Sequence, residues 1–142
     1  MDALAEVSAP PVRMFTQRFS ATRRGARLAR YLATLQLHDW GVPLGGDASY
    51  AVSVVLGELA VNAITHGRVP GRDFEVRLVL LPATGTLRVE VSDPRADRLP
   101  LTGPEGCGLR LVGAFSRGWG VTGRRIGKTV WAELCLGRNG LG

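Results

Sequence analysis

A chain of 142 residues, 45% hydrophobic and 21% charged, is long enough for one domain with its own core, and its composition is that of a soluble globular protein. Its longest apolar stretches are far shorter than the roughly 20 residues that span a bilayer, and residues 1–12 hold no signal-peptide-like apolar run, so we expect a cytoplasmic protein with no membrane partner. The net charge of +6 is almost entirely arginine, without interleaved aromatic residues, and we expect no direct nucleic-acid partner.

Hydrophobic periodicity and turn residues divide the chain into five strands and three helices. In chain order we expect a strand over 14–19, helices over 21–37 and 47–66, strands over 74–81 and 86–92, a helix over 109–115, and strands over 119–122 and 128–136. A proline-bearing leader over residues 1–12 precedes a single domain over residues 13–142. This order predicts an α+β fold, a two-layer sandwich with helices on one face of a mixed, mostly antiparallel sheet.

The first predicted helix begins after Ser20, which is a good N-cap residue. Four large apolar side chains recur at helical spacing and predict the face that packs on the core. They are Leu28, Tyr31, Leu32 and Leu35.

The second predicted helix carries polar groups on an otherwise apolar surface. Because residues 47–66 are apolar nearly all round, we expect this helix to be largely buried. Glu58 and Asn62 are four residues apart and therefore lie on the same face, and Thr65 and His66 continue the line. A buried carboxylate and a buried amide are costly unless they are satisfied. Either a neighbouring loop satisfies them, or the helix lines a polar cavity and presents them to a ligand.

Three further features favour a ligand. Asp93 ends a strand before Pro94, and a carboxylate there can accept a hydrogen bond from an exocyclic amine. Gly106 and Gly108 precede a helix, where unpaired backbone N–H groups and the helix dipole favour an anion. Residues 94–105 connect these two features, where a lid over a ligand would lie.

Four motifs in this order and spacing resemble the GHKL ATPase superfamily, whose domains have the Bergerat fold. Within that superfamily, the small size of the chain and its run over residues 128–134 resemble the stand-alone anti-sigma-factor serine kinases, in particular the actinobacterial regulators of this type. The resemblance covers residues 14–136. The motifs are ELAVNAITHG at 58–67, VSDP at 91–94, GCGL at 106–109 and KTVW at 128–131.

The resemblance implies a role for each matched residue. Asn62 would coordinate the Mg²⁺ that bridges the ATP phosphates, and Glu58 would be the general base that accepts the proton of the attacking hydroxyl. Asp93 would recognise the adenine amino group, supported by Thr129 through water. The remaining nucleotide-binding residues implied are His66, Gly106, Gly108 and Leu109.

The resemblance also implies a function, for which ATP and Mg²⁺ are the cofactors. Such kinases phosphorylate a serine of an anti-anti-sigma (STAS-type) protein, bind a sigma factor, regulate transcription by partner switching and are homodimers. An alternative is an ATP-sensing protein-binding module without kinase activity, in which nucleotide only shifts partner affinity. A third is nucleic-acid binding by an arginine cluster, which is better explained as a solvated face or a docking surface for an acidic protein. That cluster is Arg23, Arg24, Arg27 and Arg30.

Overall fold

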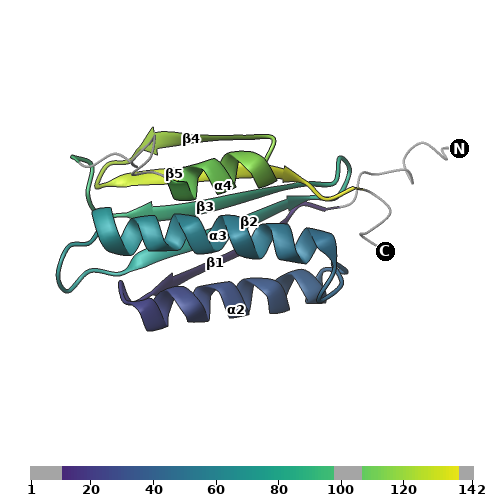
Figure 1. Cartoon of the computed structure of the whole chain (residues 1–142), viewed down its shortest axis with the longest axis horizontal. Coiled ribbons are helices and arrows are strands. Elements are labelled where there is room, and N and C mark those ends of the chain that lie inside the picture. The colour runs from purple at the N-terminus through teal and green to yellow at the C-terminus, as the bar shows by residue number, and fades with distance from the viewer. Residues whose placement is uncertain (1–10, 98–106, 138–142) are drawn as a thin grey trace, which may run out of the picture.

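The computed structural model describes residues 11–97 and 107–137, which fold into helices on one face of a sheet (Figure 1). The α+β sandwich expected from the sequence is confirmed. Of the predicted leader, only Pro11 and Val12 fall within the described residues. The elements in chain order are β1 (Arg13–Phe19), α2 (Arg23–Asp39), α3 (Asp47–His66), β2 (Phe74–Leu81), β3 (Thr86–Asp93), α4 (Cys107–Phe115), β4 (Gly118–Gly123) and β5 (Lys128–Cys135).

The sheet has the strand order β1-β2-β3-β5-β4, and each of its four pairings within the described ranges is antiparallel. The mixed sheet expected from the sequence is therefore corrected to an antiparallel one. The reason lies in the crossover through α4, which makes β4 run in the same direction as β3. Because β5 then inserts between these two strands, they never pair with each other.

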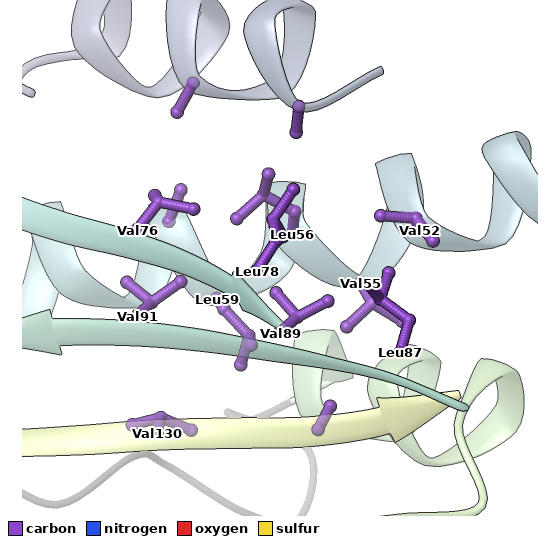
Figure 2. Packing of buried hydrophobic residues seen from close by; sticks show 14 of the residues in the cluster. Val52, Val55, Leu56, Leu59, Val76, Leu78, Leu87, Val89, Val91 and Val130 are labelled. Carbon is purple, nitrogen blue, oxygen red and sulfur yellow. The ribbon is translucent and has the colours of Figure 1, made fainter. Parts of the chain in front are cut away.

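The core lies between α3 and the central strands (Figure 2). By length and composition alone, α3 could cross a membrane, since an 18-residue window of it has a mean hydropathy of 1.4. Its inner face instead packs on β2 and β3, which makes it the core helix of the sandwich. The side chains that are at most 1% exposed there include Val52, Val55, Leu56, Leu59, Val76, Leu78, Leu87, Val89 and Val91.

The outer face of α3 differs from the expectation of a largely buried helix. Tyr50 is 62% exposed and Val61 is 50% exposed, although both belong to the apolar run. Only the inner face has a sheet to pack against, so the prediction was right for half of the helix. The apolar outer residues are free to line a surface groove between the helices.

The N-terminal cap and the packing face of α2 also differ from the prediction. Thr22, not Ser20, caps the helix, because its Oγ1 accepts a hydrogen bond from the backbone N–H of Gly25 at 3.0 Å. The core-facing residues of α2 are mostly small; of the predicted stripe, Leu32 packs against the core, whereas Leu28 is 45%, Tyr31 is 61% and Leu35 is 37% exposed. Small side chains let α2 approach α3 closely, and the three exposed large ones lie partly in solvent. The buried residues of α2 are Gly25, Ala26, Ala29, Ala33 and Leu37.

Candidate nucleotide site

Four chain segments meet at one end of the sandwich, on the left of Figure 1. They are the C-terminal end of α3, the end of β3, the beginning of α4 and the beginning of β5. The fold therefore brings together the four motifs that the sequence singles out, although up to 73 positions separate them along the chain (from residue 58 to residue 131). The site therefore consists of the ends of helices and strands, where backbone groups and polar side chains are not covered by the hydrophobic core.

The polar stripe of α3 is accessible. Glu58, Asn62 and His66 are each half-buried, on successive turns that lead toward the end of β3. Within the described ranges, no hydrogen bond or ion pair from another residue reaches the side chains of Glu58 or Asn62. A carboxylate and an amide with free polar atoms on a core helix favour the ligand interpretation over satisfaction by protein groups.

Asp93 is a deeply buried carboxylate at the end of β3, with a side chain only 3% exposed. Its Oδ1 accepts hydrogen bonds from the Lys128 Nζ at 3.0 Å and from the backbone N–H of Arg95 at 2.9 Å. No described residue donates to its Oδ2. The carboxylate is thus fixed in place and keeps acceptor capacity.

Two glycines pack against Asp93. A Cβ on Gly67, directly after α3, would lie 2.2 Å from the Asp93 Cγ. Gly127 has φ of +85°, which favours glycine, and a Cβ there would lie 1.9 Å from the Asp93 carbonyl oxygen. These contacts explain why glycine stands at both positions and why the carboxylate can lie so close to α3.

The sheet register places Thr129 on the other face from this carboxylate. Lys128 pairs with Asp93 in the register, whereas Thr129 pairs with Ser92, and the two hydroxyls of that second pair are 2.7 Å apart. Because successive residues of a strand point to opposite faces, Thr129 faces away from α3. The structure therefore brings Lys128 to Asp93 and does not bring Thr129 there.

Helix α4 begins at Cys107, two residues earlier than predicted, so Gly108 and Leu109 belong to its first turn. Leu109 is 8% exposed and anchors this turn on the core. Gly106 and most of the predicted lid (residues 98–105) lie outside the described residues.

The described start of the lid is held by ion pairing. Arg95 donates to both carboxylate oxygens of Asp97, at 3.0 and 2.7 Å, and this hydrogen bonding raises the pKa of the Arg95 guanidinium. The Arg95 carbonyl oxygen in turn accepts a hydrogen bond from the Lys128 Nζ at 2.7 Å. The chain leaving β3 is therefore tied to β5 directly behind Asp93.

A groove of about 430 Å³ runs along the outer surface between α2, α3 and α4, and Glu58 lines it. Its other lining residues include the apolar outer side chains of α3 and three arginines of α2, namely Arg23, Arg27 and Arg30. Arg30 donates to the Ser53 Oγ at 3.1 Å and lies against Gly57, so it is fixed one residue from Glu58 along the helix. The groove thus has basic residues of α2 on one side and the polar face of α3, with Glu58, on the other.

The model of the histidine kinase-like ATPase domain family matches residues 8–133. The chain belongs to this family. Membership of a family of ATPase domains implies ATP binding, and it confirms the resemblance to the GHKL superfamily. The match spans every described element from β1 to the greater part of β5.

A search of solved structures gives a neighbour with the same fold. The chain superposes on the RsbU and RsbW domains of Rv1364c from Mycobacterium tuberculosis with a TM-score of 0.64 and 22% sequence identity. The alignment covers 89% of this chain and 33% of that one, so the chain spans about a third of the length of the protein it matches. A search of curated proteins found no match.

The residues of the site fit the nucleotide that this ATPase family takes. Asp93 offers a fixed buried acceptor to an exocyclic amine, and the absence of a side chain on Gly67 lets the carboxylate take this position against the end of α3. No cluster of three His, Cys, Asp or Glu side chains occurs among the described residues, so protein groups of these types do not form a metal cage there. Mg²⁺ bound through a single amide oxygen and the phosphates of the nucleotide fits that donor set, because the ion retains several waters.

Proposed function

We propose that this chain is an anti-sigma-factor-type protein-serine kinase that uses Mg-ATP to phosphorylate an anti-anti-sigma (STAS-type) partner in the cytoplasm. The observation that carries the proposal is the accessible pair of Glu58 and Asn62 on the core helix that leads to the buried Asp93. Family membership and the likeness to a structure containing an RsbW domain support it. Sigma-factor binding and control of transcription by partner switching are part of the same proposal.

Each group has a definite task in this reaction. Asp93 would accept the hydrogen bond of the adenine amine, and the first turn of α4, which contains Gly108 and Leu109, would offer its N–H groups to the phosphates. Asn62 gives Mg²⁺ an oxygen ligand, and His66 borders the nucleotide one turn further on. Glu58 accepts the proton of the partner's serine hydroxyl as that oxygen attacks the γ-phosphorus of ATP, and ADP leaves. Phosphoryl transfer needs little more than positioning and charge neutralisation, which these groups supply.

Asn62→Ala tests the site first. We expect isothermal titration calorimetry to show that this change weakens Mg-ATP binding by roughly tenfold or more, since one metal ligand is lost. Gln36→Ala removes an amide from α2, away from the site, and should leave the affinity unchanged. Equal Mg-ATP affinity in wild type and Asn62→Ala would remove Asn62 as the ligand, and a folded wild-type chain that binds no Mg-ATP would contradict the proposed function.

The basic groove is the proposed docking surface for the partner. Its arginine rim complements an acidic surface, and Glu58 in its wall puts the base next to a docked serine. Reversing two charges with Arg23→Glu and Arg27→Glu should slow association with a purified STAS-domain substrate about tenfold at low salt, with a smaller effect at high salt. Arg13→Glu with Arg125→Glu reverses two exposed charges off the groove and serves as the control. Equal losses in both double variants would point to net charge alone.

Homodimerisation is also part of the proposal, through the face of the sheet that no described helix covers. Arg77 lies on that face and is half-buried, so a second copy of the chain can pack against its accessible part. Light scattering of the purified chain should give the molar mass of a dimer, and Arg77→Ala should lower it to that of a monomer. A monomeric wild-type chain would refute this part.

A further inference from the structure

Lys128 is a buried cation that the reaction described above does not use. Its side chain is 3% exposed, and it lies at the beginning of β5, on the face that looks toward α3. It is also the only lysine in a chain whose other seventeen basic residues are arginine. A buried ammonium requires several polar partners, so its position beside Asp93 calls for an explanation.

The hydrogen bonds of Lys128 leave one donor over. An ammonium group has three N–H bonds. Two of them go to the Asp93 Oδ1 at 3.0 Å and to the Arg95 carbonyl oxygen at 2.7 Å. Within the described ranges, the third has no acceptor.

The pair therefore presents an acceptor and a donor side by side. Asp93 keeps its Oδ2 free of described donors, and the Lys128 Nζ lies 3.0 Å from the other oxygen of the same carboxylate. The edge of adenine has the complementary pattern, since its 6-amino group donates and the adjacent ring nitrogen N1 accepts. A 6-oxo purine has the reverse order, an acceptor at position 6 and a donor at N1.

We propose that Lys128 is a specificity-determining residue that donates its third hydrogen bond to N1 of adenine, while Asp93 accepts from the 6-amino group. This inference rests on the proposed function, because it refines the same ATP site. It assigns to Lys128 the supporting role that the sequence motif implied for Thr129, whose hydroxyl pairs with Ser92 on the opposite face. Two adjacent contacts of opposite polarity read the base in one orientation only.

The test compares ATP with 1-deaza-ATP, in which a C–H replaces N1 and everything else is kept. Wild-type protein should bind 1-deaza-ATP roughly tenfold to hundredfold more weakly than ATP in calorimetric titrations with Mg²⁺, as expected for the loss of one charge-assisted hydrogen bond. This comparison needs no variant. Equal affinity for the two nucleotides overturns the assignment, and failure to bind ATP overturns the proposed site itself.

Three variants identify the residue that reads N1. Lys128→Met should bind both nucleotides with the same affinity, and Lys128→Arg, which keeps a donor, should restore part of the preference for ATP. Thr129→Val should keep the full preference. If Lys128→Met retains the wild-type preference, Lys128 only supports the structure of the site. If this variant binds ATP more tightly, Lys128 hinders binding. Either result overturns the inference. A preference lost in Thr129→Val would assign the contact to Thr129 and overturn the inference.

Discussion

Glu58→Ala is expected to reduce phosphoryl transfer from ATP to the partner serine by about 100-fold to 10,000-fold, the range for a general base. The carboxylate lines the groove proposed for the partner, and no described residue competes for it by a hydrogen bond or an ion pair. Its loss removes the acceptor for the serine proton. Single-turnover assays with radiolabelled ATP and a purified STAS-domain protein measure the effect.

The same variant should bind Mg-ATP with nearly unchanged affinity, because the base contacts the attacking hydroxyl and not the nucleotide. Glu58→Gln keeps the size and polarity of the side chain and should be as slow as the alanine variant, which separates proton acceptance from packing. Transfer at the wild-type rate in both variants would eliminate Glu58 as the base. If wild type binds Mg-ATP and binds its partners in a nucleotide-dependent way but never transfers phosphate, the chain is the ATP-sensing binding module instead.

The sequence predicts the α+β sandwich, and it predicts which residues lie together in the candidate site, because both depend largely on local patterns. The four-residue spacing of Glu58 and Asn62 guarantees a shared helix face, whatever the rest of the fold does. The carboxylate of Asp93 is placed by a strand that Pro94 ends. Both predictions hold even when the predicted end of a helix or strand is wrong by one or two residues, as it is for the beginning of α4.

The sequence motif alone does not show whether Lys128 or Thr129 lies beside Asp93. That assignment requires the register of the sheet, because the register determines which face each side chain points to. In a strand, a change of one position moves a side chain to the other face. The signal was present in the alternation of β5, where Val130, Ala132 and Leu134 are buried and Lys128 falls on the same face. A lysine at a core-facing position contradicts the usual rule for charged residues, and only a buried partner such as Asp93 makes it stable.

The packing of α2 shows a second limit. Large apolar side chains at helical spacing predict a core face, yet Leu28 and Tyr31 are exposed while Ala29 and Ala33 are buried. The distance between α2 and α3 determines whether small or large side chains of α2 pack between them. That distance depends on the tertiary structure, so the sequence of α2 alone does not reveal it. The exposed stripe leaves apolar surface on α2 beside the basic groove, where the proposed partner would dock.

The second large effect is expected in the stability of the apo protein. Lys128→Met and Asp93→Asn should each lower the free energy of unfolding by about 3–5 kcal/mol, because each leaves a buried charge without its partner. Both side chains of the pair are only 3% exposed, so solvent screens them little. Urea denaturation without nucleotide measures the change, and both variants should show an unchanged dependence on urea concentration.

The double variant Asp93→Asn/Lys128→Met removes both charges and should be clearly more stable than the sum of the two single losses predicts, since no uncompensated charge is left. Arg18→Gln provides the control for an exposed pair. Arg18 lies 3.8 Å from Glu75 with 76% of its side chain exposed, and its replacement should change the stability by less than about 1 kcal/mol. If the two single changes simply add, the coupling between Asp93 and Lys128 is absent, and the carboxylate would then be positioned by Gly67, Gly127 and the Arg95 backbone instead.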